Sequence, residues 1–123
     1  MRILLCDDTA ELRALLRSVL EAKVGVTIVG EAGDGDGALA RAAEAQPDIV
    51  VLDLEMPGPA PPALLRALRR AAPAAAIVTF SGHEPAAVAG EAVGEIALHV
   101  AKTTELAVAA QAVWELGRNH HAS

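Results

Sequence analysis

The chain has little cysteine, little positive charge and no long apolar run, and each shortage excludes a class of protein. Its one cysteine, Cys6, rules out a disulfide within the chain and lies in an apolar stretch, as a small buried side chain would. Ten basic residues against sixteen acidic ones give a formal net charge of −6. This balance argues against direct contact with nucleic acid, so any DNA contact would need another domain.

Membrane-spanning and exported proteins are also disfavoured. No apolar run approaches the roughly 18 residues that a membrane-spanning helix needs. The first residues lead directly into a strand pattern, without the basic segment and small-residue cleavage site of a signal peptide. We therefore expect a soluble, cytoplasmic protein with no membrane partner.

The hydrophobic pattern alternates between strands and helices over 123 residues, enough for one domain. Apolar runs predict five strands, at residues 3–6, 24–31, 48–53, 75–80 and 96–101. Amphipathic spacing predicts five helices, at residues 10–22, 38–45, 61–71, 85–92 and 104–118. Because crossovers between parallel strands are right-handed, this order predicts an α/β fold with a doubly wound, five-stranded parallel sheet. We expect the domain to span residues 1–119 and residues 120–123 to form a disordered tail.

Carboxylates stand at the ends of two predicted strands. Asp7 and Asp8 follow the first strand, and Asp53 ends the third, directly after four branched apolar residues. Because parallel strands end at one edge of the sheet, these three carboxylates should share a pocket. Two carboxylates ~4 Å apart repel by ~4 kcal/mol at an effective dielectric of ~20, so three call for a cation. Oxygen ligands with room for water indicate Mg²⁺.

Two further polar side chains complete the predicted pocket. Ser81 follows the fourth strand and Lys102 follows the fifth. Lys102 can neutralise an additional anion, and the Ser81 hydroxyl can hydrogen-bond to it. A carboxylate, a magnesium ion, a lysine and a hydroxyl around one point suit phosphoryl transfer onto the carboxylate. We therefore predict Asp53 as the nucleophile, with Lys102 and Ser81 as catalytic partners.

Five short motifs coincide with these positions: Asp7-Asp8, Gly30-Glu31-Ala32-Gly33-Asp34-Gly35, Asp53-Leu54-Glu55-Met56-Pro57-Gly58, Ser81 and Lys102-Thr103. In this order and spacing, the chain resembles a response-regulator receiver domain of two-component signalling over nearly all its length. The Gly-Glu-Ala stretch and the threonine after Lys102 are most similar to receivers that precede helix-turn-helix DNA-binding domains. The resemblance implies the flavodoxin-like (βα)5 receiver fold.

The resemblance also implies roles for the site residues. Asp53 would be the phosphoacceptor, and Asp8, Asp53 and the backbone carbonyl of Glu55 would coordinate Mg²⁺. Asp7 would act largely through water, and Lys102 would contact the phosphoryl group. The chain would phosphorylate itself from a phosphodonor and lose the group slowly, without turning over a separate substrate as an enzyme does.

The implied partners follow from this chemistry. A sensor histidine kinase would supply the phosphoryl group, and phosphorylation would alter dimerisation or effector affinity. A homodimer would form through the last helices, where Trp114 lies. A DNA-binding domain C-terminal to this chain would make the protein a transcription regulator.

Some residues depart from the family pattern, and others are expected to tune it. Residues 59–62 read Pro-Ala-Pro-Pro where the family usually has Asp-Gly, and His99 replaces a Tyr or Phe that swings inward on activation. Glu55 and His83 each lie two residues after a site residue, at positions that influence how fast the phosphoryl group hydrolyses. We therefore regard His99, His83 and Glu55 as tuning residues.

Two other functions remain open. The first is a receiver-like interaction module that is never phosphorylated, which the substitutions at residue 99 and residues 59–62 favour. The second is an aspartate-nucleophile phosphohydrolase, because Asp53-Leu54-Glu55 superficially resembles the opening motif of such enzymes. These enzymes usually carry a second aspartate where this chain has Glu55, and need more chain for substrate specificity.

Overall fold

The computed structural model describes residues 1–122, with side chains described as far as His120. Its five strands are β1 Arg2–Cys6, β2 Thr27–Ala32, β3 Ile49–Asp53, β4 Ala76–Ser81 and β5 Ile96–Ala101. Its helices are α1 Ala10–Glu21, α2 Gly35–Ala45, α3 Pro61–Ala71, α4 Pro85–Ala89, the 3₁₀ helix η1 Gly90–Glu95, and α5 Leu106–Ala122. Among these residues no helix is long and apolar enough to cross a membrane.

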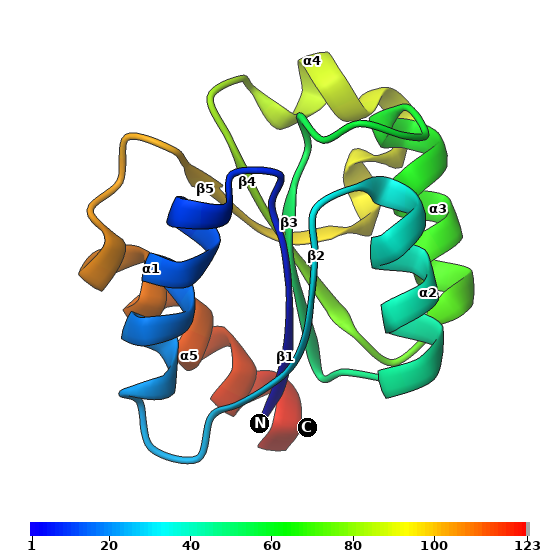
Figure 1. The fold of residues 1–123 in the computed structure, drawn as a ribbon. Coiled ribbons are helices and arrows are strands. Elements are labelled where there is room, and N and C mark those ends of the chain that lie inside the picture. The colour runs from blue at the N-terminus through cyan, green and yellow to red at the C-terminus, as the bar shows by residue number, and fades with distance from the viewer. Residues whose placement is uncertain (123) are drawn as a thin grey trace.

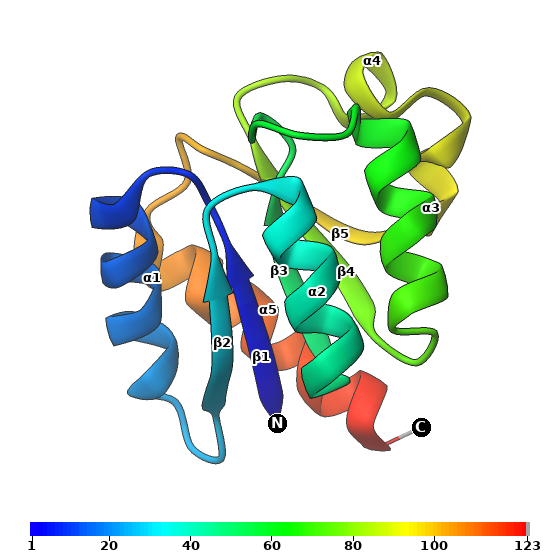
Figure 2. The same ribbon diagram turned by 45° about the vertical axis from the view of Figure 1, so that its right-hand side comes forward.

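The five strands form one parallel sheet in the order β2-β1-β3-β4-β5. Helices α1 and α5 cover one face, and α2, α3 and α4 lie on the other, as Figures 1 and 2 show. The predicted doubly wound, five-stranded parallel sheet is therefore confirmed. The chain reverses its direction of winding between β1 and β3, and in open α/β sheets ligands bind outside the carboxyl ends of the strands at such a point.

The central strands are buried on both faces because side chains alternate along a strand. On β3, Val50 and Leu52 pack in the core beneath α2 and α3, whereas Ile49 and Val51 pack beneath α1 and α5. All four are at most 3% exposed. This run of branched residues thus fixes β3 in the middle of the sheet and leaves Asp53 at its carboxyl end.

The main differences from the predicted boundaries lie at helix ends and at β2, which begins at Thr27 and not at residue 24. Helix α2 begins three residues earlier than predicted, because the side chain of Asp34 caps it by accepting a hydrogen bond from the Gly37 N–H at 2.6 Å. The predicted fourth helix is split into α4 and η1 at Gly90, whose φ of +56° suits glycine. The helix predicted to end at 118 continues to Ala122. Residues 120–122, which were expected in a disordered tail, belong to α5 in the structure, and Ser123 lies outside the described residues.

The proline-rich loop after β3 is anchored on the first turn of α2. The Gly35 N–H donates to the carbonyl of Pro57 at 2.9 Å, and a Cβ on Gly35 would lie only 2.8 Å from Pro59 Cδ. Pro61 opens α3, where a missing N–H costs nothing. The loop that carries Glu55 is thus held at both ends.

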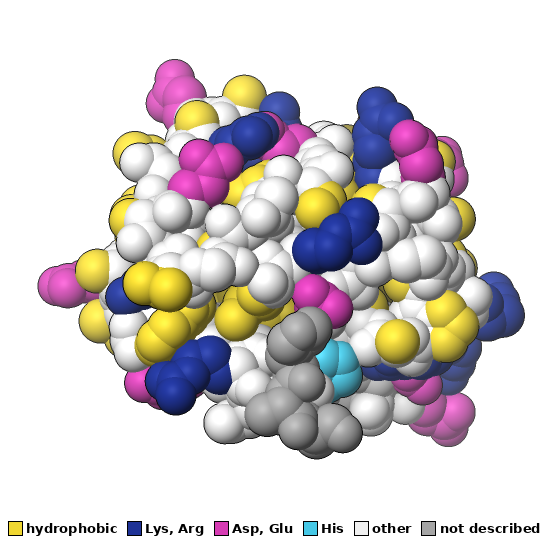
Figure 3. Space-filling view, turned by 90° about the horizontal axis from the view of Figure 1, so that it is seen from below, with side chains coloured by type: hydrophobic (Ala, Val, Ile, Leu, Met, Phe, Trp, Pro, Cys, Tyr) yellow, Lys and Arg dark blue, Asp and Glu magenta, His cyan; other side chains and the backbone are white. Residues whose placement is uncertain are grey.

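The end of the molecule opposite the strand-end carboxylates carries mixed charges (Figure 3). Figure 3 views the side where the strands begin, and charges of both signs are scattered across it. Hydrophobic side chains gather there on the side of α1 and α5. The half-buried Trp114 of α5 donates its ring N–H to the carbonyl of Val24 at 3.0 Å, which ties α5 to the turn after α1.

Candidate functional site

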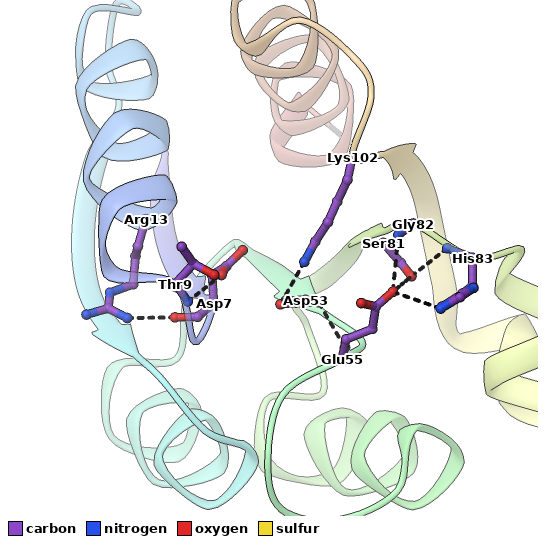
Figure 4. Close-up of polar contacts among 9 residues, drawn as sticks. All are labelled: Asp7, Thr9, Arg13, Asp53, Glu55, Ser81, Gly82, His83 and Lys102. Atoms are coloured by element: carbon purple, nitrogen blue, oxygen red, sulfur yellow. Dashed lines mark hydrogen bonds and ion pairs between the residues drawn. The ribbon is translucent and has the colours of Figure 1, made fainter.

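The carboxyl ends of β1, β3, β4 and β5 bring the predicted site residues together. Asp7 follows β1, Asp53 and Ser81 end β3 and β4, and Lys102 follows β5. In Figure 4 Lys102 extends from above toward Asp53, with Asp7 on one side and Ser81 on the other. The predicted clustering of these residues is therefore present in the structure.

The three aspartates form an acid pocket, the name used below for Asp7, Asp8 and Asp53. One oxygen of each lies within 4.8 Å of the others, and Asp7 and Asp53 are 2% and 1% exposed. Oδ1 of Asp7 accepts a hydrogen bond from the Thr9 N–H at 2.8 Å, whereas its buried Oδ2 has no hydrogen-bond partner among the described residues. A buried, unpartnered carboxylate oxygen beside two more carboxylates fits a hard cation such as Mg²⁺.

Asp53 has both oxygens engaged although its side chain is fully buried. Oδ2 lies 3.1 Å from Lys102 Nζ, and Oδ1 accepts the Glu55 backbone N–H at 2.8 Å. Burial raises the pKa of Asp53 above its usual 3.8, and the negative charge of Asp7 adds to this. The Glu55 N–H and Lys102 oppose the rise in pKa without cancelling it.

Lys102 places a positive charge next to Asp53. Its partial burial lowers its pKa, but the hydrogen bond and charge of Asp53, with the charges of Asp7 and Glu55, outweigh this and raise the pKa above 10.5. The amine therefore stays protonated at neutral pH. Its backbone N–H donates to the carbonyl of Ser81 at 3.0 Å, which fixes the start of the β5–α5 loop.

Ser81 is buried and faces Glu55. Its hydroxyl donates to Glu55 Oε1 at 3.0 Å and accepts the His83 backbone N–H at 3.1 Å. Glu55 Oε1 also accepts the Gly82 N–H at 3.3 Å and lies 3.5 Å from His83 Nε2. The hydrogen bond from Ser81 is the largest influence on the pKa of Glu55 and, with the other donors, holds it below 4.5. The predicted tuning residues Glu55 and His83 thus meet at one serine.

His99 makes no described contact with Ser81, Glu55 or His83 and lies within β5. It pairs in register with Thr79 of β4, and its Nδ1 lies 2.7 Å from the Thr79 hydroxyl oxygen. The ring is half-buried, and Thr79 is fully buried. One of the two ring nitrogens of this half-buried imidazole therefore has a hydrogen-bond partner.

Arg13 and Glu31 also support the site, although no sequence pattern indicated their contact. Arg13 Nη1 donates to the backbone carbonyl of Asp7 at 2.6 Å, and its Nε donates to Glu31 Oε1 at 2.9 Å. Partial burial raises the pKa of Glu31, but hydrogen bonds from Arg17 and Arg13 reverse this and hold it below 4.5. The one feature of the sequence that could have indicated the contact with Asp7 is the position of Arg13, one turn into the helix that follows β1.

Comparison with known proteins agrees with this geometry. The model of the response regulator receiver domain matches residues 3–113. A protein-glutamate methylesterase/protein-glutamine glutaminase of Myxococcus xanthus is 42% identical over 120 residues, which is 95% of this chain and 34% of that protein. The chain thus spans about a third of the length of this curated relative.

Solved structures give the same family. A LuxR-family two-component response regulator from Aurantimonas sp. is 34% identical, with a TM-score of 0.83 over 96% of this chain and 85% of that one. The response regulator domain of Thermotoga maritima CheB has the same fold, with a TM-score of 0.83, 24% identity and coverage of 100% and 97%. The LuxR-family neighbour agrees with the predicted resemblance, whereas the methylesterase relative does not support the predicted role in transcription.

Proposed function

This chain belongs to the response regulator receiver family, and we propose that it is a phosphorylatable signalling switch whose phosphoacceptor is Asp53. A sensor histidine kinase supplies the phosphoryl group, and Mg²⁺ in the acid pocket is required for the transfer. Phosphorylation then changes the affinity of the domain for an effector or for a second copy of itself.

The environment of Asp53 carries this proposal. Its side chain is fully buried, yet it has a lysine at 3.1 Å and two further carboxylates beside it. One lysine would suffice to pair a buried structural aspartate. Three clustered carboxylates destabilise a fold unless a cation binds between them, so their presence is better explained by a ligand than by stability.

The reaction needs a nucleophile, a departing group and compensation of charge. An oxygen of Asp53 forms a bond to the phosphorus of the kinase phosphohistidine as the P–N bond breaks, and the electron pair of that bond stays on the imidazole nitrogen. The ammonium group of Lys102 lies where it can pair with an oxygen of the transferred group. The burial of the Asp53 side chain limits the access of water to the reacting carboxylate.

The residues that would hold Mg²⁺ are those of the acid pocket, together with the backbone carbonyl of Glu55. When bound, the ion supplies positive charge to the phosphoryl oxygens. Asp7 contributes an unpartnered oxygen that is already buried, and the exposed Asp8 closes the pocket toward solvent. In this proposal Asp8 and Asp53 bind the ion directly, and Asp7 acts largely through water.

Intact-mass measurement after incubation with acetyl phosphate and Mg²⁺ tests the proposal. We expect one added phosphoryl group on the wild type and none on Asp53→Asn. Asp36→Asn, which removes an exposed aspartate from the first turn of α2, is the matched control and should be phosphorylated normally. An adduct that persists on Asp53→Asn would refute Asp53 as the acceptor.

The same experiment separates the two alternatives. A domain that acts without phosphorylation would gain no phosphoryl group from any phosphodonor, even with Mg²⁺ present. Its binding to a partner would then not depend on Asp53. A phosphohydrolase would release phosphate continuously from small phosphate esters. Glu55, which such an enzyme would need as an acid or base, is instead occupied by Ser81 and Gly82.

The output of the switch is a separate proposal. The 42% identity to the Myxococcus methylesterase favours an effector of that enzyme class over a DNA-binding domain. A homodimer through the last helices, and a cytoplasmic location beside the kinase, complete the proposal. Fusion of this chain to the catalytic domain of that relative would test the output, because phosphorylation should then change esterase activity.

A further inference from the structure

The hydroxyl of Ser81 already makes two hydrogen bonds in the structure. A serine hydroxyl carries one proton, and here that proton goes to Glu55 Oε1 at 3.0 Å. The oxygen of the same hydroxyl accepts the His83 N–H at 3.1 Å. Ser81 is 1% exposed, so no solvent competes for these two hydrogen bonds. The hydroxyl therefore has no free proton to donate toward Asp53.

The acceptor, Glu55, is itself held in place. Oε1 receives the Gly82 N–H at 3.3 Å as well as the Ser81 hydroxyl, and the ring of His83 lies 3.5 Å away. In Figure 4 one carboxylate oxygen of Glu55 points to Ser81, Gly82 and His83. The last residue of β4 and two residues of the β4–α4 loop thus converge on one carboxylate oxygen of the β3–α3 loop.

We propose that Glu55 is a positioning residue that latches Ser81 in the resting state and competes with the phosphoryl group on Asp53 for the Ser81 hydroxyl. The latch rests on the proposed function, since it acts only when Asp53 carries a phosphoryl group. For Ser81 to donate to that group, its hydrogen bond to Glu55 must break. The end of β4 then loses its hydrogen bond to the β3–α3 loop, which is one of the three contacts made to Glu55 Oε1.

The latch has a measurable cost for the active state. A hydrogen bond to a charged acceptor must be given up before the Ser81 hydroxyl can turn, and the loss is reduced because Glu55 is partly exposed to solvent. Glu55→Ala removes the acceptor, so we expect it to tighten binding of beryllofluoride, a phosphoryl mimic, by about fivefold. Glu55→Gln keeps an oxygen acceptor without the charge and should tighten it by about twofold.

The affinity of beryllofluoride at saturating Mg²⁺, measured by fluorine NMR, provides the test. The matched control is Glu84→Ala. Glu84 lies in the same loop and is exposed, and its carboxylate makes no described hydrogen bond to Ser81. Glu84→Ala should bind as the wild type does, which separates the latch from a general loss of negative charge. In a Ser81→Ala background, Glu55→Ala should no longer change the affinity.

A second readout follows the latch directly. In the wild type, the amide resonances of Gly82 and His83 should shift when beryllofluoride binds, because both N–H groups belong to the latch. In Glu55→Ala the Gly82 resonance should have moved before any ligand is added. A purely structural role for Glu55 would alter these resonances without a change in affinity.

Each outcome decides one proposal. If the wild type fails to bind beryllofluoride, the proposed phosphorylation is refuted. If the wild type binds but Glu55→Ala binds equally, or if the gain persists with Ser81→Ala, the latch alone is refuted.

Discussion

Asp7→Asn should stabilise the metal-free protein and remove most of its stabilisation by Mg²⁺. Asp7 is buried, its Oδ1 accepts the Thr9 N–H, and its Oδ2 has no hydrogen-bond partner among the side chains described. Asparagine has the same shape and keeps an oxygen for Thr9. It removes one negative charge next to Asp53 and places an N–H where carboxylate oxygens can accept it.

The size of the effect follows from the acid pocket. At the largest separation in the pocket, 4.8 Å, two carboxylate oxygens repel by ~3.5 kcal/mol at an effective dielectric of ~20. Lys102, 3.1 Å from Asp53, neutralises part of this repulsion. We therefore expect the free energy of unfolding to rise by about 1–2 kcal/mol, which in a domain of this size raises Tm by about 4–8 °C.

Thermal unfolding followed by circular dichroism, with a chelator and again with saturating Mg²⁺, measures both effects. The wild type should gain stability on adding Mg²⁺, because a ligand that binds only the folded state stabilises it. Asp7→Asn should start higher and gain little, and the exposed control Asp36→Asn should behave as the wild type. If Asp7→Asn melts at or below the wild type in chelator, repulsion between the carboxylates does not control the stability of the pocket. If its gain from Mg²⁺ is unchanged, Asp7 takes no part in holding the ion.

Three further predictions concern residues around the pocket. Burial raises the pKa of Cys6 to about 12, so its thiol should resist alkylation in the native protein at neutral pH and react only on unfolding; rapid labelling of the folded chain would contradict this. The lowered pKa of Glu31 contributes stability that is present above pH 4.5 and is lost as the pH falls through the folded pKa. Glu31→Gln should therefore lower the free energy of unfolding by about 1 kcal/mol at neutral pH. In urea unfolding, the mutant should lose less stability on acidification than the wild type. His99→Tyr should strengthen dimerisation or partner binding with beryllofluoride present, because it removes an imidazole whose Nδ1 contacts Thr79, and should leave the rate of Asp53 phosphorylation nearly unchanged. Equal dimerisation of the wild type and His99→Tyr in sedimentation with beryllofluoride present would refute a role for His99.

Local patterns in the sequence determined the fold and the composition of the site. The branched run before Asp53 suits a strand covered on both faces, and the prolines before Leu64 fit only a loop or the first turn of a helix, so β3 and α3 were predicted almost to the residue. The strand ends then placed Asp7, Asp53 and Lys102 at one edge of the sheet. These inferences needed only the period of side chains along a strand and the order of the elements.

Helix boundaries that depend on a single side chain were harder to predict. The early start of α2 rests on one hydrogen bond from Gly37 to Asp34, within a glycine-rich run that the sequence pattern assigned to a loop. The split after α4 rests on the positive φ of Gly90. Both features are decided by one backbone conformation, for which hydrophobic periodicity carries no signal.

Only the tertiary structure decided which polar groups pair. Ser81 was expected to face the phosphoryl site, but its proton goes to Glu55, 26 residues away in the chain. Arg13 reaches the carbonyl of Asp7 because α1 packs beside the end of β1. Such pairs depend on the rotamer of each side chain and on the relative placement of two loops to within a few tenths of an ångström. The sequence specifies which groups are present at the pocket, whereas the packing of loop against loop determines which donor meets which acceptor.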